Sequence, residues 1–113
     1  MKNILRTLAL SLCFVLHSVN SYAAGYAWGT LYDVHFTGSG AVIAYINGPR
    51  QNVPTCAVSF PNRFAIDGTS AAGKVQVSGL LSAYLTQKVV VITGTGDCVA
   101  TGTEETINYF YID

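Results

Sequence analysis

Residues 28–46 read WGTLYDVHFTGSGAVIAYI and predict an antiparallel β-hairpin. Over residues 27–37, side chains alternate with period two and are rich in aromatic and β-branched types, which is typical of a half-buried strand. One face would carry Trp28, Thr30, Tyr32, Val34 and Phe36, and the other would carry Leu31, Asp33 and His35. The Gly38-Ser39-Gly40 segment permits a tight turn because glycine tolerates positive φ. The second strand then covers residues 41–46.

Three more strands are expected, at residues 55–60 with extended chain over 63–66, at 88–93 and at 106–112. Residues 89–92 are apolar on both faces, as in a central strand that is covered on two sides. The last strand contains Tyr109, Phe110 and Tyr111, whose side chains must alternate between the two faces. At least one of these aromatic side chains therefore points outward.

One helix is expected over about residues 70–86. Apolar side chains recur at i, i+3, i+4 and i+7, which is the spacing of one helix face: Val77, Leu80, Leu81 and Tyr84. Thr69 or Ser70 would cap its first turn. Gly73 and Gly79 lower the intrinsic helix propensity, so packing must stabilise the helix.

Five short strands with a helix between the third and the fourth follow the element order of the oligonucleotide/oligosaccharide-binding (OB) barrel. The chain is therefore predicted to be mainly β. It would form either a small OB-like barrel or a curved antiparallel sheet with the helix packed on one face. The strand count does not distinguish between these two architectures.

The N-terminal segment has the pattern of a secretory signal peptide. Lys2 and Arg6 precede an apolar run that is too short to span a bilayer as a helix. Small residues place the cleavage after Ala23, with Ala24 as the second choice. Residues 1–23 are thus expected to be removed, leaving residues 24–113 as one periplasmic or secreted domain without a membrane anchor.

Two cysteines remain after this expected processing, Cys56 and Cys98. An exported protein meets an oxidising environment, so a disulfide between them is expected. Two free thiols or a metal-bound pair are the alternatives, although there is no CxxC spacing and no neighbouring histidine.

Charged residues are few. In residues 24–113 the bases are Arg50, Arg63, Lys74 and Lys88, and the acids are Asp33, Asp67, Asp97, Glu104, Glu105 and Asp113. Such a chain has no basic face for nucleic acid and no basic amphipathic helix for a membrane surface. Residues 68–74 resemble a phosphate-binding loop, but Val75 replaces the required hydroxyl residue, and no cofactor is expected.

Candidate catalytic residues are sparse, and the domain is not expected to be an enzyme. Asp33 lies two residues before His35 and could orient its imidazole, but no motif marks a nucleophile. The adjacent acids Glu104 and Glu105 would point to opposite faces and are expected to form a solvated strand entrance. A single histidine with scattered carboxylates predicts no metal site.

Aromatic residues are the strongest functional signal. Tyrosine and tryptophan present a flat apolar body with a polar tip, which suits sugars and protein interfaces. The proposed ligand-binding residues on the first strand are Trp28, Tyr32, Asp33 and His35.

The chain also resembles known exported proteins. It resembles a group of small exported proteins of Gram-negative bacteria. The likeness lies in Cys56, residues 63–67, Gly73-Lys74, Leu80-Leu81, Ala83-Tyr84, residues 94–96 before Cys98, and residues 105–109. More distantly, the chain resembles the B-subunit family of subtilase cytotoxin and pertussis-like toxins. The shared features are a Trp/Gly-rich start of the first strand, a cysteine flanked by short strands, a helix, a β-branched strand and a final cysteine.

This second resemblance implies an oligosaccharide-binding barrel, assembly into a pentameric ring and glycan recognition at the first strand. Trp28 precedes Gly29 where that family has a glycan-binding serine, so its sialic-acid recognition does not carry over. The first hypothesis is a non-enzymatic binding module for a glycan or a protein. The alternative is a periplasmic structural or inhibitor-like protein whose strand edge pairs with an envelope or secreted protein. A small hydrolase that uses His35 is the third.

Overall fold

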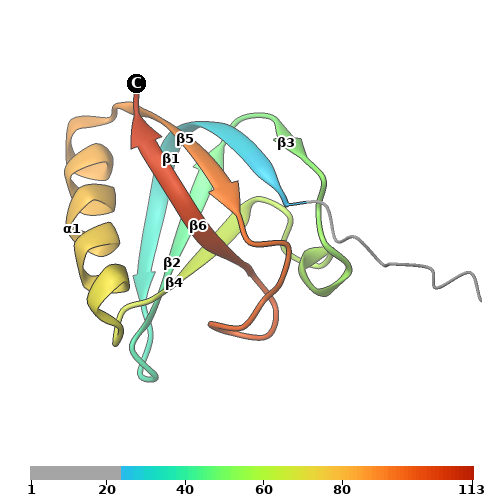
Figure 1. Cartoon of the computed structure of the whole chain (residues 1–113). Coiled ribbons are helices and arrows are strands. Elements are labelled where there is room, and N and C mark those ends of the chain that lie inside the picture. The colour runs from blue at the N-terminus through green and yellow to red at the C-terminus, as the bar shows by residue number, and fades with distance from the viewer. Residues whose placement is uncertain (1–23) are drawn as a thin grey trace, which may run out of the picture.

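The computed structural model describes residues 24–113, which form one six-stranded sheet, one α-helix and a short 3-10 helix (Figure 1). The elements are β1 (Tyr26–Phe36), β2 (Ala41–Asn47), β3 (Arg50–Gln51), η1 (Thr55–Ala57), β4 (Arg63–Asp67), α1 (Ala71–Thr86), β5 (Val89–Gly94) and β6 (Glu105–Ile112). The signal peptide expected over residues 1–23 lies outside the described residues. No helix within residues 24–113 is long and apolar enough to cross a membrane.

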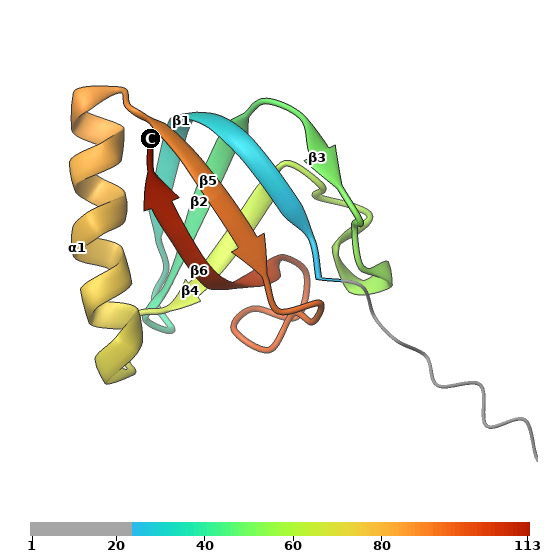
Figure 2. The ribbon, with the colours of Figure 1, turned by 45° about the horizontal axis from the view of Figure 1, so that its top comes forward.

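The sheet closes on itself as a ring. Antiparallel pairing joins β1 to β2, β2 to β4, β6 to β5 and β5 back to β1, while β4 and β6 pair in parallel. In Figure 2, β5 and β6 cross in front of β2 and β4. The predicted hairpin and the mainly β fold with one α-helix are confirmed. The parallel β4–β6 pair departs from a purely antiparallel sheet.

The sheet has six strands instead of the expected five. The additional strand, β3, contains two residues and pairs with the start of β1. The local sequence does not indicate this strand, because two residues are too few to show periodicity. With β3 included, α1 lies between the fourth and fifth strands rather than between the third and fourth.

Residues 55–60 do not form the expected third strand. Thr55–Ala57 form η1, and the chain then turns. Pro54 and Pro61 bracket the segment and have no backbone N–H to donate to a strand ladder. The third strand of the ring is instead β4, which pairs with β2.

A β-bulge at Tyr32 changes the faces of β1. Leu31 and Asp33 pair with consecutive residues of β2, so Tyr32 is the extra residue. Leu31 is fully buried, and beyond the bulge Val34 packs against the same core. The expected single face from Trp28 to Phe36 is therefore wrong at this point: Tyr32 is the extra residue and is 50% exposed, whereas Val34 and Phe36 lie opposite the core residues Ala44 and Val42 on the inner face.

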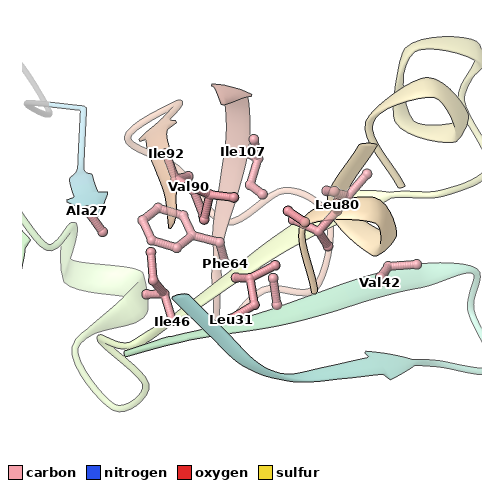
Figure 3. Close-up of a cluster of buried hydrophobic side chains, with 12 residues drawn as sticks. Ala27, Leu31, Val42, Ile46, Phe64, Leu80, Val90, Ile92 and Ile107 are labelled. Atoms are coloured by element: carbon pink, nitrogen blue, oxygen red, sulfur yellow. The ribbon is translucent and has the colours of Figure 1, made fainter. Parts of the chain in front are cut away.

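The ring encloses the hydrophobic core (Figure 3). The buried cluster contains Ala27, Leu31, Val42, Ala44, Ile46, Phe64, Ile66, Leu80, Ala83, Val90, Ile92 and Ile107. In Figure 3, Ala27 and Leu80 lie at opposite sides of this cluster with Phe64 between them. Leu80 and Ala83 come from α1, so the helix covers one end of the core.

The helix begins where the sequence predicts. The Ser70 hydroxyl accepts the Gly73 N–H at 2.9 Å and caps the first turn. A Cβ at Gly73 would lie 1.7 Å from the Asp67 carbonyl oxygen, so only glycine fits this close approach. The Thr69 hydroxyl (2.6 Å) and the Thr69 N–H (3.0 Å) donate to the Asp67 carboxylate and lower its pKa. The close approach of the helix start to Asp67 therefore explains why residues 68–74, which resemble a phosphate-binding loop, have a glycine at position 73.

The Cys56–Cys98 disulfide is confirmed, with the two Cα atoms 6.1 Å apart. It joins η1 to the loop between β5 and β6. This covalent link holds together two segments that are not part of the β-sheet.

A buried ion pair lies on the Ala27 side of the core, away from α1. Arg50 donates through Nη2 to Glu105, and their side chains are 8% and 0% exposed. The other Glu105 oxygen accepts the N–H groups of Gly25 and Gly96, each at 2.8 Å. The guanidinium also stacks 4.0 Å from the centre of the Phe64 ring. Burial lowers the pKa of Arg50, and the Glu105 carboxylate opposes this shift.

The expectation that Glu104 and Glu105 form a solvated strand entrance is therefore wrong. Glu104 is 3% exposed and accepts the hydroxyls of Thr101 and Thr103 at 2.5 and 2.6 Å. Each carboxylate is buried because it has its own set of donors, which is the condition for burying a charged group. The burial of Glu105 could not be predicted from the sequence around it, because its partner Arg50 is far away in the chain.

Candidate functional site

The four binding residues predicted from the sequence fall into two separate groups. Tyr32, Asp33 and His35 belong to a polar cluster beside β2 and β4, which we define as Tyr32, Asp33, His35, Tyr45 and Arg63. Trp28 has no contact with this cluster among the aromatic pairs and hydrogen bonds of the described residues. It lines a different hollow with residues of β3, β5 and β6.

The polar cluster is organised around His35. Its Nε2 lies 2.8 Å from Asp33 Oδ2, and its Nδ1 lies 3.0 Å from the Tyr45 hydroxyl. Tyr45 is buried under its neighbours, and Tyr32 meets its ring edge-on with the centroids 5.7 Å apart. The Tyr32 hydroxyl accepts a hydrogen bond from the Asn62 amide.

Arg63 covers the other side of this cluster. Its guanidinium stacks over the rings of Tyr45 and Phe60, at 4.6 and 4.1 Å from their centres. It also lies 3.7 Å from Glu104. These contacts hold Arg63 against the protein and account for the burial of Tyr45 on the outer side of the ring.

The polar cluster places an imidazole between a carboxylate and a phenol. Both ring nitrogens of His35 are hydrogen-bonded within the protein, one to the Asp33 carboxylate and the other to the Tyr45 hydroxyl. No serine, threonine or cysteine is hydrogen-bonded to His35 among residues 24–113. Because the side chains of His35 and Asp33 are about half exposed, their pair is a weak, screened interaction.

A second site, the aromatic trough, is built across four adjacent strands. It is lined by Tyr26, Trp28, Gln51, Val89, Val91, Tyr111 and Asp113, and it encloses about 380 Å³. Strand register explains why these distant residues meet. Trp28 is opposite Val91, and Val91 is opposite Tyr111, so the three form one row across β1, β5 and β6. Residues opposite each other in a sheet point to the same face.

Aromatic side chains form both walls of this trough. Tyr26 and Trp28 are neighbours on β1, with ring centroids 5.4 Å apart and planes tilted by 49°. Tyr111 stands across from them on β6 and is 53% exposed. Between the walls, Val91 is only 7% exposed although it lies on the outer face of β5. The aromatic walls therefore explain why β5 is apolar on both faces.

Polar groups stand at opposite sides of the trough. Gln51 on β3 is opposite Tyr26, and Asp113 follows β6, where its N–H donates to the Val89 carbonyl at 2.8 Å. With adjacent strands about 4.8 Å apart, the span from β3 to β6 is roughly 14 Å. The arrangement is an apolar, aromatic floor with hydrogen-bonding groups at its edges.

The expectation for the last strand is confirmed. Tyr109 and Tyr111 are 55% and 53% exposed, whereas Phe110 packs against the core. Phe110 also lies close to α1, since a Cβ at Gly79 would be 3.3 Å from its ring. Gly79 thus allows the helix to approach β6.

Two other hollows are present in the described part of the chain. One, of about 530 Å³, adjoins the disulfide and is lined by Pro54, Thr55, Cys56, Gly96, Asp97, Cys98, Val99 and Gly102. The other, of about 380 Å³, lies between α1 and β6 and includes Val75, Gly79 and Phe110. Neither contains a residue proposed from the sequence for ligand binding.

Of the trough residues, only Trp28 is a ligand-binding residue predicted from the sequence. Tyr26 and Tyr111 were visible as aromatic residues, and period-two alternation places Tyr26 on the same face as Trp28. Gln51 and Asp113 carried no local signal, because only the pairing of β3 with β1 and of β6 with β5 brings them to this face.

No family model, curated protein or solved structure matches this chain. Within residues 24–113, no three histidine, cysteine or acidic side chains are grouped so that they could hold a metal ion.

Proposed function

We propose that this domain is a non-enzymatic carbohydrate-binding module and that the aromatic trough is its binding site. The observation that carries the proposal is the row of Trp28, Val91 and Tyr111, with Tyr26 beside Trp28. The C–H faces of a sugar ring pack on aromatic and aliphatic surfaces, and its hydroxyls bond to polar groups at the edge. Gln51 and Asp113 are placed to serve as those groups.

The dimensions of the trough support a small oligosaccharide as its ligand. Its volume of about 380 Å³ lies in the range of about 300–1,000 Å³ that is usual for ligand sites. Its roughly 14 Å span fits two or three sugar units laid across the strands. The walls come from regular strands, which position side chains more firmly than loops do.

The proposal places the domain outside the cytoplasm, in the periplasm or as a secreted protein. The Cys56–Cys98 disulfide supports this location, because disulfides persist in oxidising compartments. Removal of residues 1–23 as a signal peptide and assembly into a homo-oligomer remain part of the same proposal. The solution mass of the exported domain checks both.

The geometry gives less support to the two alternatives. A structural or inhibitor-like protein would offer a strand edge to its partner, but β1 pairs with β3 and β5 over residues 26–30 and with β2 over residues 30–36, so that the longest stretch without a partner strand on one side is residues 31–36. A hydrolase would use His35 to activate a nucleophile, and the only hydroxyl hydrogen-bonded to His35 among residues 24–113 is the phenol of the buried Tyr45.

Glycan binding is expected to depend on Trp28 and not on Tyr32, although the sequence proposed both. Truncating a central aromatic anchor commonly costs more than about 1.4 kcal/mol, so Trp28→Ala should weaken binding at least about tenfold. Tyr32→Ala is the matched control, because Tyr32 lies on the same strand but in the polar cluster. The measurement is a glycan array probed with the labelled mature domain, followed by calorimetric titration of the glycans that bind.

A second variant separates loss of binding from loss of folding. Tyr111→Ala removes the opposite wall at a side chain that is 53% exposed, so the fold should tolerate it. Weakened binding by a variant with an unchanged thermal transition supports the trough. Absence of binding by the wild-type domain across the array overturns the proposal, and so does binding that only Tyr32→Ala abolishes.

A further inference from the structure

The only residue of the aromatic trough that is charged at neutral pH is an acid. Asp113 contributes a carboxylate, and none of the other lining residues is basic. Gln51 contributes an amide that both donates and accepts hydrogen bonds. Among the side chains that line the trough, a ligand therefore meets one negative charge and otherwise neutral groups.

The basic side chains of residues 24–113 are placed elsewhere. Arg50 is in the buried ion pair, and Arg63 is stacked in the polar cluster. Lys74 is exposed on α1, and Lys88 is exposed just after that helix. None of the four lines the trough, and none forms an ion pair with Asp113 among residues 24–113.

The hydrogen-bonding capacity of Asp113, like its charge, disfavours an acidic ligand. An ionised carboxylate only accepts hydrogen bonds. Sugar hydroxyls can donate to it, whereas a carboxylate or sulfate group on a glycan offers acceptors alone. An acidic glycan would thus meet both a repulsive charge and a mismatched hydrogen-bonding partner at this side of the trough.

We infer that the aromatic trough selects uncharged glycans and excludes those that carry a carboxylate or sulfate group near the bound sugar, with Asp113 as the excluding residue. This inference rests on the proposed glycan-binding function. Two like charges about 4 Å apart repel by an amount that corresponds to about fivefold in affinity even in bulk water. Acidic forms of a bound glycan should therefore bind about fivefold more weakly or worse.

The test compares matched glycans on one array. Each neutral oligosaccharide is printed beside its sialylated, glucuronate-bearing and sulfated forms, and binding is measured for wild type, Asp113→Asn, Asp97→Asn and Trp28→Ala. Asp97→Asn is the charge-matched control, because Asp97 is an exposed acid beside the disulfide and outside the trough. Repetition at high ionic strength adds a second readout, since salt screens exposed charges.

The expected result is binding of neutral forms by wild type, with recovery of the acidic forms in Asp113→Asn or in high salt but not in Asp97→Asn. Acidic forms that bind wild type as well as neutral ones do, through Trp28, would overturn the inference while leaving the proposed function intact. Equal gains in Asp113→Asn and Asp97→Asn would also overturn it, because the effect would then follow net charge. Failure of every glycan to bind would overturn the proposed function itself.

Discussion

Glu105→Gln is expected to lower the free energy of unfolding by about 3–5 kcal/mol, the usual cost of removing one partner from a buried ion pair. The substitution preserves shape but leaves the Arg50 guanidinium buried without its counter-charge. It also removes an acceptor, since an amide has one oxygen for the three donors that the carboxylate serves, which are Arg50, Gly25 and Gly96. Urea unfolding followed by circular dichroism measures the change.

Asp113→Asn is the matched control for this variant. It makes the same chemical change at an exposed position and should alter stability by no more than about 0.5 kcal/mol. Arg50→Met should destabilise the domain strongly, because it leaves the buried Glu105 carboxylate without its cation. A Glu105→Gln domain as stable as wild type would show that the pair is not buried in solution.

Removing the disulfide with Cys56→Ala and Cys98→Ala is expected to cost about 4 kcal/mol. The two cysteines are 42 residues apart in sequence. In the loop-entropy model, closing a loop of this length lowers the conformational entropy of the unfolded chain and so stabilises the folded state by about 4 kcal/mol. This is a large part of the stability of a small domain, which is typically about 5–15 kcal/mol. Urea unfolding of the two proteins gives the difference.

Reductant provides the control for the disulfide. Dithiothreitol should destabilise the wild-type domain by a similar amount and should leave the double alanine variant unchanged. Equal unfolding midpoints for wild type and double variant, with unchanged slopes, would mean that this bond does not restrain the unfolded chain.

Local patterns predicted most elements of the fold but not the details of pairing. The hairpin, α1 with its Ser70 cap, and the last two strands follow from alternation, helical spacing and capping chemistry, which are local. The bulge at Tyr32 does not, because it is defined by the partner strand. The strand expected at residues 55–60 was wrong, because the prolines that flank the segment oppose a strand more strongly than its β-branched and aromatic residues favour one.

The proposed binding site was only partly predictable, for a related reason. A strand shows which of its own side chains share a face, so Trp28 and Tyr26 could be grouped. Which residues of other strands join them depends on register, and this brings Tyr111 and Gln51 to the trough. His35 and Asp33 do contact each other as their spacing suggested, but Tyr45 completes their hydrogen bonding from β2.

The most direct test of the account is an NMR titration of the mature domain with the neutral glycan that gives the strongest array signal. If the aromatic trough binds it, the amide shifts that change most should belong to residues 26–28, 89–91 and 111–113. The indole N–H of Trp28, the only tryptophan, should shift with them. Shifts centred on His35 and Tyr45, with residues 26–28 and 111–113 unaffected, would contradict the account and move the site to the polar cluster.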